Sequence, residues 1–384
     1  MTKGEKLNMD KIIKKVVLIG VISLFLFAAL VLILSNFRNQ ANKPPNKEAR
    51  ESEKEQSTQR LTTIASNLEI PWALAFLPGG DILFTERPGK VKLVDKNGSG
   101  NPALVADIAE VKHIGEGGLL GIALHPDFAN NKYVYLYYTY SGTKDNTLNR
   151  VVRYKFENGR LTNQQIIVDA IPGAVNHNGG RIKFGPDNFL YIATGDAQNP
   201  SLAQDINSLS GKILRVTDDG KPADTNPFGN LIYSWGHRNP QGLTWDNKGR
   251  LWATEHGNQA HDELNLIEKG TNYGWPVITG DGEKEGMRKP VLQSGSATWA
   301  PSGAAYVLNS IFFAGLRGNA LYEAKIVGSG ADLGKHLKGE LGRIREVVLA
   351  PDGFFLYITT SNRDTRGVPR DGDDKIIKIN VQKL

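Results

Sequence analysis

Three polar clusters between residues 176 and 258 contain the side chains best suited to chemistry. They read NHNGGR (176–181), GHRNPQG (236–242) and EHGN (255–258), and strand-like runs separate them, which places them on loops. Histidine can act as a general base, arginine binds anions, and oxygen donors suit Ca²⁺. His177 precedes a Gly-Gly pair that allows close approach of a ligand, although a turn histidine bonded to the backbone is the alternative. The clusters form an active site only if the fold brings the loops together.

The second cluster combines an arginine with two amides. Arg238, Asn239 and Gln241 together suit a planar, polyanionic ligand. The structural alternative is an arginine that packs on Trp235 or Trp245.

The third cluster offers hard oxygen ligands. Gly257 and Asn258 are followed closely by Asp262 and Glu263, so carbonyls and carboxylates share a short loop that could bind Ca²⁺. The spacing is not that of an EF-hand, and a solvated acidic loop is the alternative.

Further arginines occur late in the chain. Arg343 and Arg345 are two positions apart on an expected strand, so they face the same side, and Arg317 lies in a preceding loop. Several arginines directed at one channel are costly without an anion, whereas a surface stripe is the ordinary interpretation.

A repeated phrase predicts the fold that must position these residues. A Pro/Asp/Asn/Gly turn followed by an alternating or aromatic strand recurs roughly every 40 to 63 residues, a period typical of propeller blades. Its copies begin at Pro78, Pro126, Pro186, Asp246, Leu308 and Pro351.

Six units indicate an all-β, six-bladed β-propeller, with a pair of β-sandwiches as the alternative. Strands over Leu61–Ser66 and Lys375–Asn380 are expected to share one blade and close the ring. In a propeller the inner strands and their loops converge on one central channel, so side chains of different units can meet there.

The N-terminal region differs from the rest. Val16–Leu34 is an uncharged apolar run preceded by Lys11, Lys14 and Lys15. We expect a cytoplasmic N-terminus (1–15), a transmembrane signal anchor (16–35), a polar linker (36–60) and the propeller (61–384) outside the cytoplasm. A cleaved signal peptide is the alternative.

Composition excludes some functions. The 384-residue chain has no cysteine, so disulfides and lipid-modified cysteines are excluded. Residues 1–60 hold 11 Lys and Arg against 6 Asp and Glu, which leaves 35 against 34 for residues 61–384. A nearly neutral domain argues against nucleic acid as a partner.

Six phrases, in order, resemble the soluble glucose and aldose dehydrogenases that use pyrroloquinoline quinone (PQQ), the glucose/sorbosone dehydrogenase family. They are IPWALAFLPGGDILFTER (70–87), GEGGLLGIALHPDF (115–128), NHNGGRIKFGPD (176–187), GHRNPQGL (236–243), DELNLIEKGTNYGWP (262–276) and RIREVVLAPDG (343–353). The resemblance spans nearly all of residues 61–384 and implies a six-bladed propeller, in agreement with the repeat count.

The resemblance also implies roles for single residues. His177 is similar to the base that takes the proton of the sugar's anomeric hydroxyl, Asp196 to the acid that supports it, and Arg238 to the arginine beside the quinone. The PQQ-binding residues implied are Glu116, Asn239, Gln241, Arg317, Arg343 and Arg345, and carbonyls of Gly257 and Asn258 are implied for Ca²⁺.

Two positions depart from the family pattern. Glu116 stands where glutamine is frequent, which adds a negative charge near the sugar or quinone. Arg317 stands where a lysine can contact PQQ, so charge is kept while geometry changes. The loops between units are short, which favours an open pocket and a loose sugar preference.

The function expected is oxidation of the C1 hydroxyl of aldoses to lactones, with hydride transfer to PQQ, Ca²⁺ as Lewis acid and electrons passed to an external acceptor. The alternatives are a non-catalytic cell-surface propeller that binds glycans or proteins, and a Ca²⁺-dependent lactonase. A lactonase needs a carboxylate-rich metal site instead of converging arginines.

Overall fold

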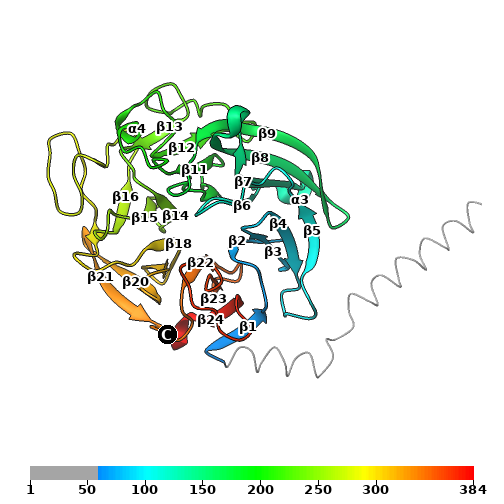
Figure 1. Cartoon of the computed structure of the whole chain (residues 1–384). Helices are drawn as coiled ribbons and strands as arrows, with labels where there is room; N and C mark the ends of the chain where they lie inside the picture. Colours follow the sequence, from blue (N-terminus) through cyan, green and yellow to red (C-terminus); the bar gives the residue numbers. More distant parts are fainter. Residues whose placement is uncertain (1–58) are drawn as a thin grey trace, which may run out of the picture. The chain divides into compact units, whose positions relative to one another are not determined.

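Six four-stranded antiparallel sheets surround a common centre in the computed structural model, which describes residues 59–384 (Figure 1). Blade 1 is β2 (Pro71–Phe76), β3 (Ile82–Glu86), β4 (Lys90–Val94) and β5 (Ala103–Asp107), and blade 2 is β6 (Leu119–Leu124), β7 (Tyr133–Ser141), β8 (Thr147–Glu157) and β9 (Arg160–Pro172). Blade 3 is β10 (Ile182–Phe184), β11 (Leu190–Thr194), β12 (Lys212–Val216) and β13 (Ile232–Trp235).

The remaining blades complete the ring. Blade 4 is β14 (Pro240–Trp245), β15 (Leu251–Glu255), β16 (Glu263–Ile267) and β17 (Leu292–Gln293), and blade 5 is β18 (Pro301–Val307), β19 (Ser310–Gly315), β20 (Ala320–Val327) and β21 (Gly330–His336). Blade 6 is β22 (Ile344–Leu349), β23 (Phe355–Thr360), β24 (Ile376–Asn380) and β1 (Leu61–Ala65). Short helices α3 (Phe128–Asn131), α4 (Ser201–Gln204), η1 (Thr143–Asp145) and η2 (Val381–Lys383) lie between or after strands.

The predicted six-bladed propeller is confirmed, and the β-sandwich alternative is wrong. Blade 6 joins the two ends of the described chain, because β1 pairs antiparallel with β24 from Leu61 opposite Ile379 to Ala65 opposite Ile376. The expected shared blade therefore closes the ring, with bounds within one residue of the prediction.

The repeated phrase corresponds to the second strand of every blade, namely β3, β7, β11, β15, β19 and β23. In four blades the turn before this strand has a residue with positive φ whose N–H donates to the carbonyl three positions earlier; these are Gly80, Asn188, Gly249 and Gly353. Glycine and asparagine tolerate that backbone conformation, which explains why the phrase begins with Pro, Asp, Asn and Gly.

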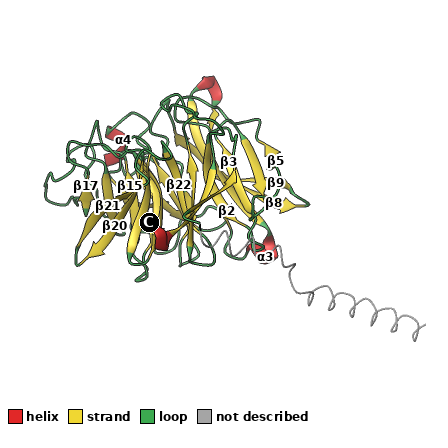
Figure 2. Cartoon of the chain, turned by 90° about the horizontal axis from the view of Figure 1, so that it is seen from below, coloured by secondary structure: helices red, strands yellow, loops and turns green. Residues whose placement is uncertain are grey.

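Two kinds of loop meet at one end of the ring. Each blade's first, inner strand is antiparallel to its second strand, so the segment entering the first strand and the segment leaving the second lie at the same end. We call these the entry loops and the second-strand loops. Loops gather at the strand ends in the side view (Figure 2). This arrangement presents two loops per blade to the mouth of the central channel.

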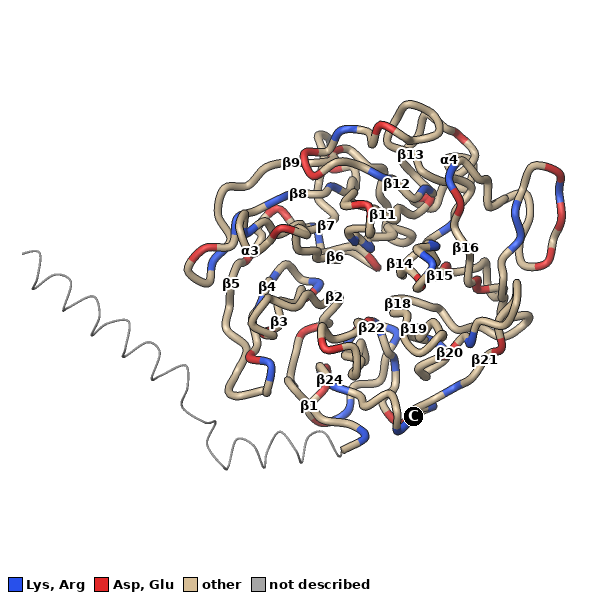
Figure 3. Tube along the Cα trace, turned by 180° about the vertical axis from the view of Figure 1, so that it is seen from behind, with Lys and Arg blue, Asp and Glu red and all other residues tan. Residues whose placement is uncertain are grey.

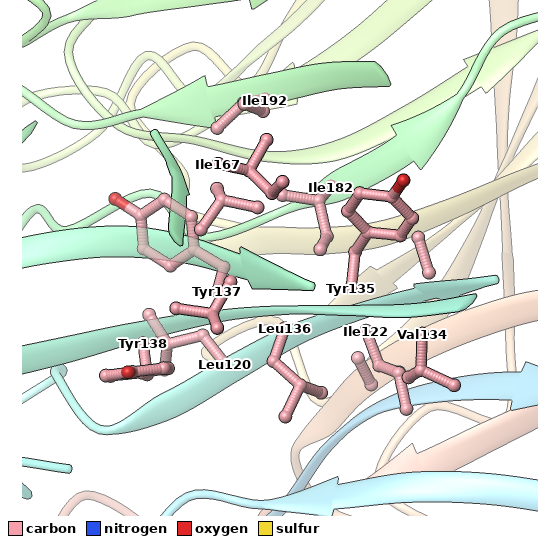
Figure 4. Close-up of a cluster of buried hydrophobic side chains, with 14 of the residues drawn as sticks. Leu120, Ile122, Val134, Tyr135, Leu136, Tyr137, Tyr138, Ile167, Ile182 and Ile192 are labelled. Atoms are coloured by element: carbon pink, nitrogen blue, oxygen red, sulfur yellow. The ribbon is translucent and has the colours of Figure 1, made fainter. Parts of the chain in front are cut away.

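Packing between blades supplies the core. The alternating strand β7 is buried almost throughout, and Tyr135, Leu136, Tyr137 and Tyr138 are fully buried among aliphatic side chains of neighbouring strands (Figure 4). Buried tyrosines need a partner for the hydroxyl, and the Tyr137 hydroxyl donates to the Asn178 carbonyl at 2.8 Å. The core of blade 2 thereby contacts the loop that carries His177.

The predicted transmembrane anchor, residues 16–35, lies outside the described residues, as do the cytoplasmic segment and nearly all of the polar linker. Within residues 59–384, no helix has the length and apolar character needed to cross a membrane.

Ring closure can be tested at Ile64, which is buried beside the neighbouring blade. Ile64→Ala removes buried methyl groups and is expected to lower the free energy of unfolding by about 2–5 kcal/mol. Thr63→Ala, on the exposed side of the same strand, is expected to change it by less than about 0.5 kcal/mol. Denaturant unfolding measures both, and equal effects would contradict the assigned closure.

Candidate active site

A cavity of about 480 Å³ opens at the end of the ring where the entry loops and second-strand loops meet. Its lining comes from blades 2 to 6, so it lies over the centre of the ring and not within one blade. The lining residues are Glu116, Asn176, His177, Arg238, Gln241, His256, Gly257, Gln259, Asp262, Thr298, Ala300, Leu316, Arg317, Arg343, Arg345 and Arg366.

The His177 ring is held by Asp196. Its Nδ1 lies 2.8 Å from Asp196 Oδ1, and Asp196 is fully buried. The second oxygen of Asp196 accepts the indole N–H of Trp275 at 2.8 Å, and Oδ1 also accepts the backbone N–H of Gln198. A carboxylate fixed in this way makes Nδ1 the protonated nitrogen and leaves Nε2 with a free lone pair. The histidine is thus arranged as an acceptor of a proton.

The backbone of His177 is fixed as firmly as its ring. His177 has φ 60°, a left-handed conformation that costs about 1 kcal/mol for a residue with a Cβ. Its N–H donates to Glu116 Oε2 at 3.0 Å and its carbonyl accepts the N–H of Ala197 at 3.2 Å. A Cβ on Gly195 would lie only 1.9 Å from the same carbonyl, so glycine is required there. The turn histidine does bond through its backbone, yet its ring remains available to the cavity.

Arg238 packs on a tryptophan that the sequence interpretation did not consider. Its guanidinium carbon lies 5.3 Å from the ring centre of Trp275, and not on Trp235 or Trp245. Its Nη1 donates to the His256 carbonyl at 3.3 Å, whereas its buried Nε has no hydrogen-bond partner in the described protein. Burial lowers the pKa of Arg238, opposed by Asp196. Trp275 therefore connects Arg238 with Asp196, the partner of the histidine.

Arg343 and Arg345 both line the cavity, so they face the same side as predicted and do not form a surface stripe. Arg343 Nη2 donates to Asp364 Oδ2 at 3.0 Å, and Arg345 Nη1 donates to Gln241 Oε1 at 2.7 Å. Burial lowers the pKa of Arg345 to about 9, although the Asp364 carboxylate opposes this, so the group remains charged at neutral pH. Its Nε is buried and has no partner within residues 59–384.

Buried side chains that do not line the cavity hold Arg345 in place. The guanidinium of Arg181 lies 4.3 Å from the ring centre of Trp72, and that of Arg345 lies 5.7 Å from it. Arg181 is paired with the buried carboxylate of Glu346 and donates from Nε to the Gln241 carbonyl at 2.8 Å. Gln241 thus links the two arginines, which restricts the rotamers of the cavity arginine.

Positive charge exceeds negative charge in the cavity wall. Five lining arginines face two lining carboxylates, and Asp364 behind the wall offsets one more charge. Charged residues of both signs occur around the centre of the ring (Figure 3). Buried donors or acceptors without a partner in the described part include Arg238 Nε, Asn239 Nδ2, His256 Nε2 and Arg345 Nε. A polyanionic ligand would supply both the missing charge and the missing acceptors.

Glu116 is the carboxylate nearest the histidine backbone. Burial alone would raise its pKa, but His256, Arg366 and the His177 N–H outweigh burial and lower the pKa to about 2. Burial lowers the pKa of His256 to about 4, so this ring is neutral at pH 7. Arg366, whose Nη1 pairs with Glu116 Oε1, is therefore the cation that balances Glu116 under ordinary conditions.

The predicted calcium ligands are only partly at the cavity. Gly257 lines it, and its N–H donates to Asp262 Oδ1 at 2.9 Å. Asn258 is not among the lining residues, and its carbonyl accepts the Ala260 N–H at 2.7 Å. Asp262 Oδ2 already accepts from Thr298 and from two backbone N–H groups. Among the described residues, no group of three or more His, Cys, Asp and Glu is arranged to hold a metal.

Most of the other predicted site residues converge. His177, Arg238, Gln241, Glu116, Arg317, Arg343 and Arg345 all line the cavity, and Asp196 lies directly behind the histidine. Asn239 does not line it: the side chain is fully buried, and its Oδ1 accepts the N–H of Gly179 at 3.0 Å. Asn239 thus positions the loop that follows the histidine.

Several lining residues have no role in the sequence-based prediction, among them Arg366, His256 and Asn176. A topological signal could have identified the first. Arg317 and Gly257 lie on the second-strand loops of blades 5 and 4, and Arg366 lies on the corresponding loop of blade 6, after β23. Counting loops by their position in the blade therefore predicts a cavity residue in the run RDTRGVPRD (363–371).

Comparison with known proteins agrees with this geometry. The family model described as "Glucose / Sorbosone dehydrogenase" matches residues 68–369. Aldose sugar dehydrogenase YliI of Escherichia coli is 32% identical over 339 residues, which cover 79% of this chain and 90% of the relative. Quinoprotein glucose dehydrogenase B of Acinetobacter calcoaceticus is 36% identical over 250 residues, covering 56% and 52%.

The solved structures include a similar protein with the cofactor bound. The PQQ-bound form of an aldose sugar dehydrogenase from Streptomyces coelicolor superposes with a TM-score of 0.80 and 44% sequence identity. The match covers 84% of this chain and 97% of that structure.

The lowered pKa of Glu116 predicts a pH-dependent contribution to stability. Its folded pKa of about 2 is below the unfolded value of 4.5, so the unfolded chain binds the proton more readily and stability falls as the pH falls through this window. Glu116→Gln is expected to lower the free energy of unfolding by about 1–2 kcal/mol at pH 7, less than the full shift implies because His256 is neutral there, and the deficit should shrink below about pH 4.5. Unfolding of both proteins at several pH values measures this, and a deficit independent of pH would contradict it.

Proposed function

We propose, since the chain belongs to the glucose/sorbosone dehydrogenase family, that it oxidises the C1 hydroxyl of aldoses to lactones with PQQ and Ca²⁺. The family and the enzyme class, PQQ-dependent aldose dehydrogenases, follow from the similarity; the cofactor contacts, the metal and the mechanism are our proposal. The observation that carries it is one cavity that combines a carboxylate-held histidine with an excess of arginines.

The cavity fits PQQ by its donors. PQQ is planar and has three carboxylates, and the unpartnered Nε groups of Arg238 and Arg345 require acceptors. Arg343 and Arg345 would hold the carboxylates, together with Arg317 at the rim. When bound, PQQ supplies the two-electron acceptor for the hydrogen on the sugar's C1.

The protein's own residues supply the proton chemistry. His177 Nε2 would accept the proton of the C1 hydroxyl, while Asp196 keeps Nδ1 protonated and stabilises the imidazolium that forms. Arg238, held against Trp275 beside the histidine's partner, would stabilise negative charge developing on oxygen. The left-handed backbone of His177 keeps its ring aimed while substrates exchange.

We place Ca²⁺ on the Gly257 side of the cavity. The backbone oxygens of Ala260 and His261 lie beside Gly257, and the neighbouring Asp262 adds negative charge. Such a site would polarise a carbonyl of the bound ligand as a Lewis acid. The arginine-rich lining of the cavity argues against the lactonase alternative, which needs a carboxylate-rich metal site.

We also propose that Val16–Leu34 anchors the domain on the outer side of a membrane, on the strength of its length and its lysine flank. The electron acceptor would then be reached outside the cytoplasm. Protease accessibility of the domain in spheroplasts, in which only the cytoplasmic membrane is intact, tests this, and a domain protected until that membrane is broken would contradict it.

Turnover tests the function directly. The purified protein, given PQQ and Ca²⁺, is expected to reduce a dye with several aldoses and to do so only when PQQ is present. A protein that binds glycans without PQQ-dependent turnover would support the non-catalytic alternative and refute ours.

His177→Asn is expected to lower kcat by about 10²–10⁴-fold, because the general base is lost, with little change in PQQ affinity. Asp196→Asn, which keeps the shape but removes the charge, is expected to lower kcat by at least about tenfold. His336→Asn is the control. His336 ends β21, the outermost strand of blade 5, and its ring pairs with Glu323 of the neighbouring strand β20. Steady-state kinetics would contradict the roles if the site variants behaved as the control does.

Removal of Ca²⁺ with a chelator is expected to lower the PQQ-dependent rate at least about tenfold, and added Ca²⁺ should restore it, because the Lewis acid is lost and regained. Rates measured with and without chelator at saturating PQQ test this. An unchanged rate would remove Ca²⁺ from the mechanism.

A further inference from the structure

Three segments far apart in the sequence meet at the mouth of the cavity. Glu116 lies on the entry loop of blade 2, His177 on the entry loop of blade 3, and Arg366 on the second-strand loop of blade 6. Blade 6 and blade 3 are separated in the ring by other blades, so their loops touch only across the mouth (Figure 1). A contact here spans the opening of the site.

Arg366 makes that contact with two partners. Its Nη1 pairs with Glu116 Oε1, and its Nη2 donates to Asn176 Oδ1 at 2.9 Å. Asn176 is the residue before His177, and the other oxygen of Glu116 accepts the His177 N–H at 3.0 Å. One guanidinium therefore holds the histidine segment twice, directly through Asn176 and indirectly through Glu116.

The solvent exposure of Arg366 and Glu116 determines how much their ion pair contributes to stability. The Arg366 side chain is 55% exposed and that of Glu116 only 14% exposed. A fully exposed ion pair contributes little, but loss of the partner of a mostly buried carboxylate leaves an uncompensated charge. Because Glu116 accepts the backbone N–H of His177, movement of that carboxylate disturbs the left-handed turn that aims the ring.

The loop that carries Arg366 is also linked to Arg343 on its own side of the cavity, through Asp364. The backbone N–H of Arg366 donates to Asp364 Oδ1 at 2.9 Å, while Asp364 Oδ2 accepts from Arg343. The same short loop thus contacts both the arginine assigned to the cofactor and the segment of the base. This loop therefore connects the side of the cavity that carries Arg343 with the segment that carries His177.

We propose that Arg366 is a positioning residue that, through Glu116 and Asn176, fastens the His177 turn across the cavity mouth in the geometry needed for proton transfer. We call the contacts of Arg366 with Glu116 and Asn176 the clasp, and its proposed role rests on the proposed function of His177 as the base. Arg366 supplies the positive charge that the mostly buried Glu116 carboxylate requires.

A double-mutant cycle tests the clasp. Arg366→Met is expected to lower kcat about tenfold and to change PQQ affinity less than about threefold, because only the base is displaced. Adding Glu116→Gln to Arg366→Met should recover most of the loss, since a neutral amide accepts the His177 N–H without a counter-ion. Arg370→Met is the control: Arg370 lies on the same loop but bonds only to the Gly339 and Glu340 carbonyls and to Asp373.

Hydrogen exchange of the His177 backbone amide, measured without cofactor, gives a readout independent of activity. Protection is expected to fall at least about tenfold in Arg366→Met, to return in the double variant and to stay unchanged in Arg370→Met. Unchanged protection in Arg366→Met, or a double variant no more active than the single, would overturn the clasp. Wild-type protein without PQQ-dependent turnover would instead refute the proposed function, so the two failures are distinct.

Discussion

Five arginines converge on one partly buried cavity, and their mutual repulsion must be balanced either by carboxylates of the protein or by a bound anion. Two unit charges about 6 Å apart repel by about 3 kcal/mol at an effective dielectric constant of about 20. Five arginines line the cavity, and the protein balances only some of them, with Asp364 on Arg343 and Glu116 on Arg366. The remaining excess and the unpartnered donors are stable because the fold is rigid, and they favour a ligand with several carboxylates.

The propeller provides that rigidity. β1 pairs with β24 and closes the ring of six blades. Trp72 and Gln241 contact Arg345, and the buried Arg181–Glu346 pair supports them from behind the cavity lining. Residues that would be surface side chains on a single sheet become cavity residues because entry loops and second-strand loops of different blades share one end. The loops thus supply most of the side chains that line the cavity, while the packed strands hold those loops in fixed positions.

The sequence predicted the fold more completely than the site. The repeated turn-and-strand phrase identified the second strand of every blade, since positive-φ residues such as Gly80 and Gly353 mark the preceding turn. Residues near a motif, such as His177 and Arg343, were also found. Arg366 was missed because its partner Glu116 is 250 positions away, and local patterns carry no information on such a contact. Asn239 was assigned to the cavity because adjacency in sequence cannot distinguish a lining side chain from one buried behind it.

Calorimetric titration of PQQ into the cofactor-free protein measures whether the arginines that line the cavity bind PQQ. Saturable one-to-one binding is expected, and Arg345→Met should weaken it at least about tenfold, because a buried charged donor and its Gln241 contact are lost. Arg370→Met, which changes a side chain that does not line the cavity, should bind as the wild type does. Absence of saturable binding, or equal affinity in all three proteins, would contradict the account.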